Sequence, residues 1–391
     1  MAHDPLLSQR ARHATTSAIR DLLEHAQRPG MISLAGGLPD PALFPVDHLA
    51  SIADQEIRAN SGHVLQYGLT AGDIDLRHHI VETTPAATDI DHVVVTTGSQ
   101  QALQLLSAVV LDPGDTVVVA EPEYLGAMQA FHNAGAELTG IPIDHGGIDL
   151  DQLENALAAG LRPKMVYLVP HFHNPSGSTL SSSRLERLFA LASHHGFLVV
   201  LDDPYRELTA DGETPVEPDA HPMAVHLRST SKILAPGLRV GWLIGPRWLT
   251  IAIERAKQSA DLHTSTVSQA IARRALAADW FPTHLATLRS ATRTKRDALC
   301  DALDATLGER ISFTRPGGGM FVWATLSGVE STDVLLTRAL DRGVASVPGS
   351  AFAVTHDLSS CLRLSWATAN TDELIDAVSR LARSVEIGSK R

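Results

Sequence analysis

The stretch STSKILAPGLRVG, residues 229–241, shapes the interpretation of the whole chain. Ser229 and Ser231 stand beside Lys232, and Arg239 follows after a Pro-Gly pair. Because proline and glycine interrupt helices, the stretch predicts a strand end, a tight loop and a second strand. Such a loop can bring hydroxyls, a guanidinium and an amine to one point. Hydroxyl and guanidinium groups bind phosphate, and an amine attacks an aldehyde. The alternative is a surface loop whose lysine is only solvated.

Length and composition indicate a globular protein of more than one domain. The 391 residues exceed one ordinary domain, and 44% hydrophobic with 19% charged residues is typical of globular chains. The formal net charge of -12 argues against nucleic acid or an anionic membrane as the main partner. With only Cys300 and Cys361, the chain has neither a disulfide framework nor a cysteine-rich zinc site.

The N-terminal segment gives no sign of export or membrane insertion. Residues 1–23 mix arginine and aspartate with apolar side chains, unlike the continuous apolar core of a signal peptide. Elsewhere, no stretch approaches the roughly 20 apolar residues that a membrane-spanning helix needs. We therefore expect a cytoplasmic protein.

Short apolar strands alternate with helical patterns through the middle of the chain. Strands are predicted over 93–97, 116–120, 164–169, 197–201, 225–229 and 240–244, and helices over 47–60, 98–110, 124–134 and 183–195. Near-continuous apolar strands separated by helices are typical of an α/β fold with a mostly parallel sheet flanked by helices. Ligands bind such sheets at the carboxyl ends of the strands. Here those ends are 98–99, 121–124, 171–177, 202–205 and 229–232.

The pattern changes after residue 245. Helices are predicted over 248–278 and 282–307, followed by a smaller α+β set with strands at 311–313, 320–325 and 361–364 and helices at 332–342 and from 372 onward. We therefore expect a second, smaller domain. The predicted division is an N-terminal arm that joins the small domain (1–46), a large domain (47–285) and a small C-terminal domain (286–391).

The stretch at 229–241 resembles the cofactor-lysine signature of the class I/II aminotransferases, which use pyridoxal 5'-phosphate (PLP) and have fold type I. Five further motifs of that family precede this stretch, in the family's order along the chain: SAIR at 17–20, SLAGGLPDP at 33–41, YGLTAG at 67–72, NPSG at 174–177 and DDPY at 202–205. The first two are similar to those of the 2-aminoadipate and kynurenine aminotransferase subgroup. The resemblance spans most of the chain and implies the PLP-dependent transferase fold, with the cofactor in the large domain.

The resemblance implies a ping-pong aminotransferase that moves an amino group from an L-amino acid to a 2-oxo acid. Lys232 then forms the Schiff base with PLP and later moves the proton at the substrate Cα. Asp202 binds the pyridine nitrogen, because the family's tyrosine stands three residues later, at Tyr205. Asp203 is left as a structural residue. Tyr205 and Asn174 bind the phenolic oxygen of the cofactor.

The resemblance also assigns the remaining cofactor contacts. The phosphate contacts are Gly98, Ser99 and Gln100 at a strand-to-helix turn, together with Ser229, Ser231 and Arg239. A helix N-terminus offers free N–H groups to an anion, and a plain helix cap is the alternative at this turn. Tyr124 stacks on the ring, with a core aromatic as the alternative. Tyr67 reaches the phosphate of a neighbouring subunit, so a homodimer is expected.

Four residues are expected to bind the substrate: Arg20, Gly37, Asn174 and Arg363. Arg363 stands among apolar neighbours on a predicted strand, and the family uses this arginine to clamp the α-carboxylate. The bare backbone at Gly37 allows a ligand to approach closely. In the subgroup Arg20 lies near the substrate side chain, where it could hold a distal carboxylate, which favours glutamate and 2-oxoglutarate as one substrate pair. A solvated arginine on a short helix is the alternative.

Some features depart from the family pattern or allow another interpretation. Glu123, His173 and Arg228 replace residues that are usual in the family, and their roles are left open. His171 and His173 form a His-x-His pair, but no further ligand set accompanies it, so no metal is expected.

A similar fold also occurs in proteins with two other functions. A PLP-dependent lyase or decarboxylase is the alternative reaction, because a fold does not fix its chemistry. The effector-binding domain of a transcription regulator is the alternative from another class. Such a regulator carries a DNA-binding module, whereas only about sixteen residues precede the SAIR motif, and we expect an enzyme.

Overall fold

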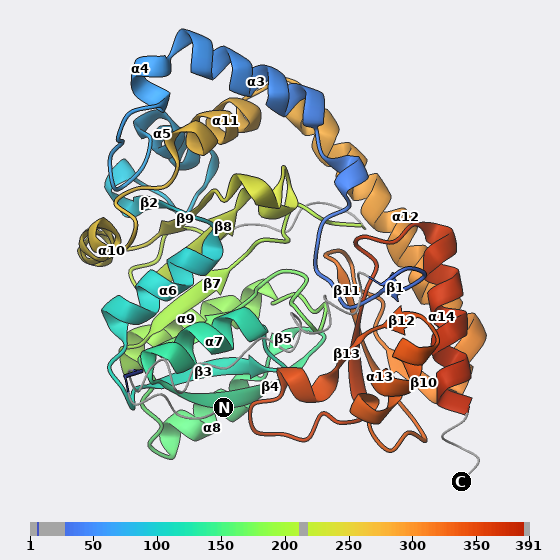
Figure 1. Ribbon diagram of the computed structural model, residues 1–391. Coiled ribbons are helices and arrows are strands. Elements are labelled where there is room, and N and C mark those ends of the chain that lie inside the picture. Colours follow the sequence, from blue (N-terminus) through green and yellow to red (C-terminus); the bar gives the residue numbers. More distant parts are fainter. Residues whose placement is uncertain (1–5, 8–27, 211–217, 387–391) are drawn as a thin grey trace.

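The computed structural model describes residues 6–7, 28–210 and 218–386, which form a large and a smaller sheet flanked by helices (Figure 1). The SAIR motif at 17–20, with Arg20, lies outside these residues. The helices up to residue 200 are α3 (Val46–Ala59), α4 (Ser61–Val64), α5 (Ile74–Thr83), α6 (Ser99–Val110), α7 (Leu125–Ala134), α8 (Leu150–Ala158) and α9 (Ser182–His195). The later ones are α10 (Arg247–Ala260), α11 (Thr266–Leu276), α12 (Phe281–Leu307), α13 (Thr332–Asp341) and α14 (Thr371–Glu386). None of the helices within the described ranges combines the length and apolar character that crossing a membrane requires.

The large sheet has the strand order β2-β9-β8-β7-β6-β3-β4-β5. Its strands are β2 (Val93–Thr96), β3 (Thr116–Glu121), β4 (Glu137–Asp144), β5 (Gly147–Ile148), β6 (Met165–Leu168), β7 (Leu198–Asp202), β8 (Ala224–Ser229) and β9 (Gly241–Ile244). The strands from β8 to β4 run parallel to one another, whereas β9 is antiparallel to both of its neighbours and β5 is antiparallel to β4. The predicted α/β fold with a mostly parallel sheet is confirmed.

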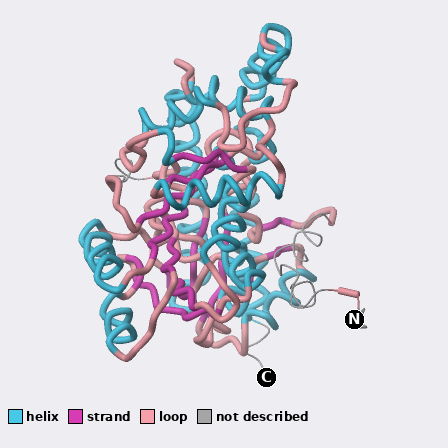
Figure 2. Tube along the Cα trace, turned by 90° about the vertical axis from the view of Figure 1, so that its left-hand side faces the viewer, coloured by secondary structure: helices cyan, strands magenta, loops and turns pink. Residues whose placement is uncertain are grey.

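Helices cover both faces of this sheet, as Figure 2 shows. In β3, Val117 and Val119 pack with α6 and α7, while Val118 and Ala120 pack with α8 and α9. Strands that are buried on both faces consist of continuous apolar residues rather than an alternating pattern. The polar side chains are therefore concentrated where the strands end.

The smaller sheet is antiparallel, with the order β10-β11-β14-β13. Its strands are β10 (Ile311–Phe313), β11 (Phe321–Leu326), β13 (Val347–Pro348) and β14 (Cys361–Ser365). Apolar residues of α12 and α14 pack against it. The short strand β1 (Ile32–Ser33) pairs in parallel with β12 (Val344–Ala345), so β1 lies with the C-terminal part of the chain (Figure 1).

Several details differ from the sequence predictions, among them α5 and α8, which the sequence analysis does not predict. The single helix predicted over 248–278 is divided into α10 and α11, and Leu262 between them has a positive φ of 67°. The sequence predicts no strand over 137–144, where the structure has β4. Gly140 and Pro142 weaken the strand pattern there, and they are tolerated because β4 lies near the edge of the sheet, beside the short β5.

Candidate active site

The carboxyl ends of the central parallel strands open into a cavity of about 370 Å³, which residues of the smaller sheet close on the other side. The cavity brings together most of the predicted site residues: Gly37, Ser99, Gln100, Tyr124, Asn174, Asp202, Tyr205, Ser229, Ser231, Lys232, Arg239 and Arg363. Two predicted residues do not line it, Gly98 and Tyr67, and Arg20 lies outside the described residues. Residues from distant parts of the chain therefore meet at one point.

Lys232 ends the short 3-10 turn Thr230–Lys232 that follows β8. Its Nζ donates a hydrogen bond of 2.8 Å to the carbonyl oxygen of Gly37. Burial, together with the positive charges of Arg363 and Arg239, lowers the pKa of Lys232 to about 8. With this pKa roughly one tenth of the amine is neutral at pH 7, and only the neutral amine is a nucleophile or a base.

Asp202 ends β7 and is 2% exposed. One carboxylate oxygen, Oδ2, accepts a hydrogen bond of 2.9 Å from the hydroxyl of Tyr167. The other oxygen, Oδ1, is buried and has no hydrogen-bond partner within the described part of the chain. Burial, with the nearby charges of Asp203 and Glu123, raises the pKa of Asp202 to about 7. A buried carboxylate with one free oxygen fits a cationic partner such as a protonated pyridine nitrogen.

At the β8 side of the cavity, a turn and an arginine form a cradle for an anion. Gly98 caps α6 with a positive φ of 78°, and a Cβ there would lie 2.5 Å from Nη2 of Arg239. Gly241 packs equally closely, because a Cβ at this position would lie 2.8 Å from the backbone nitrogen of Ser99. The first N–H groups of a helix have no partner within the helix, so they attract an anion together with the guanidinium.

The hydroxyls of Ser229 and Ser231 lie beside the same cradle. Ser229 donates to the Ser231 hydroxyl at 2.7 Å and accepts from its backbone N–H at 3.1 Å. Gly98 does not line the cavity; it lies behind the turn, where a side chain would collide with Arg239. The donors present, namely helix N–H groups, hydroxyls and a guanidinium, fit the phosphate of PLP.

Arg363 lies on β14 at the small-sheet side of the cavity and is 1% exposed. It donates through Nη1 to Oδ1 of Asn174 at 2.7 Å and through Nη2 to the carbonyl of Ala35. Its guanidinium lies 4.3 Å from the ring centre of Phe321 and 4.9 Å from that of Phe352. Burial lowers its pKa to about 10, so the group remains cationic at neutral pH. A buried planar cation of this kind fits a carboxylate.

Two tyrosines line the cavity between the anion cradle and Arg363. Tyr124 caps α7, and burial raises its pKa to about 12. Tyr205, whose ring meets that of Phe321 edge-on at 5.9 Å, has a pKa raised by burial and shares a hydrogen bond with Asn174. Both hydroxyls therefore stay protonated and can donate hydrogen bonds at neutral pH.

Tyr67 is directed away from the cavity of its own chain. It is 78% exposed, and its ring meets that of His263 edge-on at 5.9 Å. Exposed apolar side chains on the same loop accompany it, Leu65 at 63% and Leu69 at 61%. The chain therefore presents Tyr67 outward.

Of the three residues whose roles were open in the sequence, Glu123 and His173 contact each other, whereas Arg228 contacts Asp203. His173 lies 3.2 Å from Glu123, and His171 lies 2.8 Å from Asp203. Asp203 is also 3.5 Å from Arg228. These contacts support the structural role predicted for Asp203. The two histidines face different carboxylates, and the described residues contain no group of three or more potential metal ligands.

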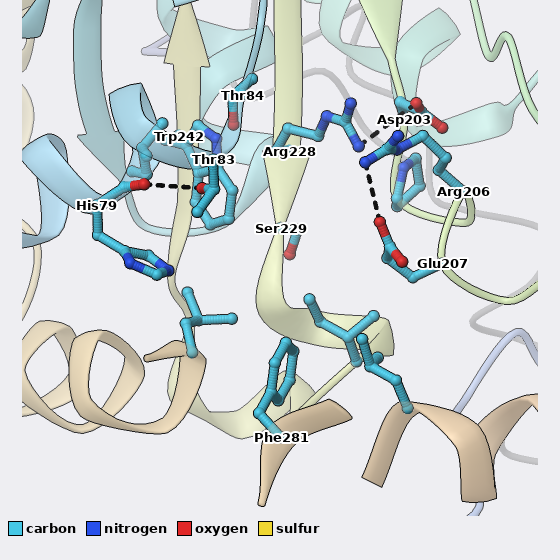
Figure 3. A pocket seen from close by; sticks show the side chains of 15 residues that line it. His79, Thr83, Thr84, Asp203, Arg206, Glu207, Arg228, Ser229, Trp242 and Phe281 are labelled. Carbon is cyan, nitrogen blue, oxygen red and sulfur yellow. Dashed lines mark hydrogen bonds and ion pairs between the residues drawn. The ribbon is translucent and has the colours of Figure 1, made fainter. Parts of the chain in front are cut away.

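A second cavity, of about 300 Å³, lies next to the first, and Figure 3 shows its lining. Ser229 and Pro204 line both cavities. Its charged side chains are paired, Arg228 with Asp203 at 3.5 Å and Arg206 with Glu207 at 3.0 Å. Arg228 thus faces this second cavity and not the first.

The sequence missed two residues that shape the site. Tyr167 has the pattern of a core residue of β6, yet its hydroxyl holds Asp202. Phe321 lies under Arg363 and against Gly37, where a Cβ would lie 2.8 Å from its ring. A hydroxyl in the middle of an otherwise apolar strand was the available signal for Tyr167, whereas the sequence offers none for Phe321.

Comparison with known proteins agrees with this geometry. The sequence model of the family described as Aminotransferase class I and II matches residues 31–381. Aromatic-amino-acid aminotransferase 1 of Thermococcus litoralis is 37% identical over 401 residues, which cover 100% of this chain and 96% of that protein.

Solved structures show the same similarity. Kynurenine aminotransferase of Pyrococcus horikoshii, in complex with PMP, superimposes with a TM-score of 0.94 at 36% identity and covers 99% of this chain and 98% of that chain. Alpha-aminoadipate aminotransferase of Thermus thermophilus, complexed with N-(5'-phosphopyridoxyl)-L-leucine, gives a TM-score of 0.90 at 36% identity, covering 98% and 97%.

Proposed function

This chain belongs to the class I and II aminotransferases, PLP-dependent enzymes of fold type I, and we propose that it moves an amino group between a bulkier L-amino acid and 2-oxoglutarate. The amino acid would be aromatic, branched or longer and acidic. It would leave as the corresponding 2-oxo acid, while 2-oxoglutarate would become glutamate. The observation that carries this proposal is one cavity that holds Lys232, Asp202 and Arg363 together. These three supply an amine of low pKa, a partly unpaired buried carboxylate and a buried guanidinium.

We assign the cofactor contacts to the residues whose chemistry fits each part of PLP. The turn at Ser99 and Gln100, with Ser229, Ser231 and Arg239, would hold the phosphate. Asp202 would bind the ring nitrogen, Tyr205 and Asn174 the phenolic oxygen, and Tyr124 one face of the ring. When bound, PLP supplies an electron-withdrawing ring that stabilises negative charge at the substrate Cα.

The protein supplies the proton transfers and the electrostatics. Lys232, neutral in part at physiological pH, would accept the proton from the substrate Cα in one half of the exchange and return a proton to the Cα of the second substrate in the other half. Asp202 keeps a positive charge at the ring nitrogen by ion pairing. Tyr167 holds this carboxylate in place through its hydrogen bond of 2.9 Å.

The substrate would lie between the cofactor and the smaller sheet. Arg363 would bind the α-carboxylate, exchanging its present hydrogen bonds to Asn174 and Ala35 for contacts to the substrate. Gly37 leaves room beside Lys232. In the described lining, the only cations are Lys232, Arg239 and Arg363, and Leu38, Leu125, Val169 and Phe321 are apolar.

That lining favours a bulky apolar side chain, and a distal carboxylate needs a further cation. We propose Arg20 for this role on the resemblance of the SAIR motif, since this residue lies outside the described part of the chain. The names of the relatives reported above refer to aromatic amino acids, kynurenine and aminoadipate. These substrates agree with a pocket that accepts both bulky apolar and acidic side chains.

We also propose a homodimer in which Tyr67 reaches the partner's phosphate site. The support is the exposure of Tyr67 and of the apolar residues beside it on the same loop.

We propose two domains, 47–285 and 286–391, with an N-terminal arm over 1–46 that joins the smaller domain. The pairing of β1 with β12 supports this division. A cytoplasmic location is supported by the chain's two cysteines, both described, which are buried and form no disulfide.

A half-reaction screen tests the proposed function. Single amino acids are added to the purified holoenzyme, and the loss of the long-wavelength absorbance of the bound cofactor is followed. We expect glutamate and at least one aromatic, branched or longer acidic amino acid to convert the cofactor and to release the matching 2-oxo acid. Conversion by neither class, or release of ammonia or carbon dioxide instead, would refute the proposal.

A further inference from the structure

The segment His171-Phe172-His173 occupies a central position at the carboxyl edge of the large sheet. It follows β6, which lies between β3 and β7 in the strand order. The residue after it, Asn174, lines the cavity, as do Tyr124 beyond the end of β3 and Asp202 at the end of β7. The segment can therefore contact the two strand ends that carry the opposite walls of the site.

Each histidine contacts a carboxylate on a different neighbouring strand end. His171 Nδ1 lies 2.8 Å from Asp203 Oδ2, next to Asp202, on the β7 side. His173 Nε2 lies 3.2 Å from Glu123 Oε1, next to Tyr124, on the β3 side. The four residues are 6%, 6%, 1% and 0% exposed in the order His171, Asp203, His173 and Glu123.

The backbone at Phe172 explains why the two histidines diverge. In an extended strand, residues two positions apart point to the same face. Phe172 instead has a positive φ of 50°, an uncommon conformation for a bulky residue. Gly318 and Gly319 pack so closely that a Cβ on them would lie 2.7 Å and 2.6 Å from Phe172. Packing thus holds a turn that sends one imidazole toward β7 and the other toward β3.

The Glu123 carboxylate also fixes the backbone around the stacking tyrosine. It accepts the backbone N–H of Tyr124 at 2.6 Å and that of Ala120 at 3.1 Å, in addition to facing His173. On the other side of the pair, Nδ1 of His173 lies 2.9 Å from the hydroxyl of Ser176. Every polar atom of this pair is therefore engaged with the strand end beside Tyr124 or with the loop that carries Asn174.

We propose that residues 171–173 act as a positioning clasp that sets the separation between Tyr124 and Asp202 across the cofactor site, an inference that rests on the cofactor placement proposed above. The clasp residues touch neither cofactor nor substrate. They act through the residues next to them, Tyr124, Asn174 and Asp202.

The contact between two residues that are distant in the sequence supports the clasp. Glu123 and His173 stand 50 positions apart, lie 3.2 Å from each other and are almost completely buried. A buried carboxylate without its partner is unfavourable, and so is a buried imidazole without a hydrogen bond. The two residues therefore depend on each other, and changing both should be less harmful than changing either.

A double-mutant cycle on the holoenzyme tests this dependence. The variants are Glu123→Thr, His173→Gln and the double variant, each measured for the rate of PLP release, the visible circular dichroism of the bound cofactor and kcat. We expect each single change to speed PLP release about 10-fold and to alter the dichroism band, whereas the double variant stays within about 3-fold of the wild type. A role in stability alone would lower the free energy of unfolding and leave the dichroism band and the release rate unchanged.

A graded variant and a control accompany the cycle. Glu123→Gln has one acceptor oxygen for the two backbone N–H groups that Oε1 and Oε2 accept, so it should speed PLP release about 5-fold, less than Glu123→Thr. It replaces Glu123→Thr in the cycle if that variant does not fold. His226→Gln removes another imidazole, 4% exposed, on β8 beside a different cavity, and should leave the dichroism band unchanged.

The outcomes separate the clasp from the proposed function. Single variants with a wild-type dichroism band and release rate would overturn the clasp, as would effects of the two single changes that simply add in the double variant. A wild-type protein that carries no PLP on Lys232 would instead refute the cofactor site itself.

Discussion

The Nζ of Lys232 lies 2.8 Å from the carbonyl oxygen of Gly37, although 195 positions separate the two residues in the sequence. Lys232 follows the last parallel strand of the large sheet, and Gly37 follows β1, which pairs with the C-terminal part of the chain. The hydrogen bond therefore joins the two halves of the molecule at the reactive amine. With Lys232 engaged by the cofactor, this carbonyl would be free to accept a hydrogen bond from a ligand.

Lys232→Ala should abolish transamination. The change removes both the amine that attacks the cofactor and the base that moves the substrate proton, so we expect turnover to fall by about 10³-fold or more. The residues that would hold the phosphate are unchanged in this variant, so PLP should still bind, but without a covalent bond to the protein. Borohydride reduction followed by mass spectrometry checks the loss of the covalent bond. Near wild-type turnover would contradict the site.

Asp202→Asn should reduce turnover by about 10²-fold or more while the protein stays folded, because the charge opposite the ring nitrogen is lost. Steady-state kinetics with glutamate measure the effect. Asp203→Asn is the matched control. It loosens the contacts to His171 and Arg228, so we expect a lower free energy of unfolding and a turnover loss of less than about 10-fold. A larger loss of turnover in Asp203→Asn than in Asp202→Asn would show that Asp203, and not Asp202, binds the ring nitrogen.

Covalent binding of PLP to the apoprotein should depend on pH through Lys232. Burial and the charges of Arg363 and Arg239 lower its pKa to about 8, so the reactive neutral form is lost as the pH falls through that value. The second-order rate constant should rise with pH and level off above about 8, as stopped-flow absorbance would show. Arg363→Gln removes one of the charges and should move the midpoint upward. A midpoint near 10.5, the value of an exposed lysine, would contradict the burial argument.

Glu121→Gln should weaken the contact between the end of β3 and the loop after Phe352. The Glu121 carboxylate accepts backbone N–H groups of Val354, Thr355 and His356 at 2.6, 2.6 and 2.8 Å. Burial opposes ionisation of Glu121, but hydrogen bonds from His356 and Thr355 outweigh it and lower the pKa to about 2. We expect a loss of about 1–2 kcal/mol in the free energy of unfolding at neutral pH, allowing for solvent screening.

The pH dependence of that loss follows from the sign of the shift. Because the folded-state pKa is depressed, the stabilisation is present above the unfolded value near 4.5 and is lost as the pH falls toward 2. Urea unfolding of wild type and variant at several pH values should therefore converge in acid. Glu137→Gln, an exposed position on β4, is the control and should change little. A difference that stays constant with pH would show that the carboxylate charge is not the cause.

Arg20→Ala should discriminate between substrates. If the guanidinium holds the distal carboxylate, kcat/KM for glutamate should fall about 10- to 150-fold, the cost of one charge-assisted pair. An aromatic amino acid should lose much less. Arg28→Ala, at an exposed position, is the control. Equal losses for both substrates, or none for either, would make Arg20 a solvated surface residue.

Much of the fold could be predicted because the large sheet is buried on both faces. Its strands are continuous apolar runs, and the polar residues that follow them mark the ligand edge. Asp202, Tyr205, Ser229 and Lys232 could be located this way because each lies at a strand end or shortly after one. Strand β4 and the break between α10 and α11 could not, since both depend on where the elements pack rather than on local pattern.

The sequence alone determined the α/β class, the order of the motifs and the residue types that meet at the strand ends. Only the tertiary structure decided which of them touch. The partners of Glu123, His171 and His173 follow from the spatial strand order, which differs from the order along the chain. The contacts of Arg363 with Asn174 and of Lys232 with Gly37 arise where the two sheets meet. Local periodicity carries no information about such pairs, because long-range packing brings them together.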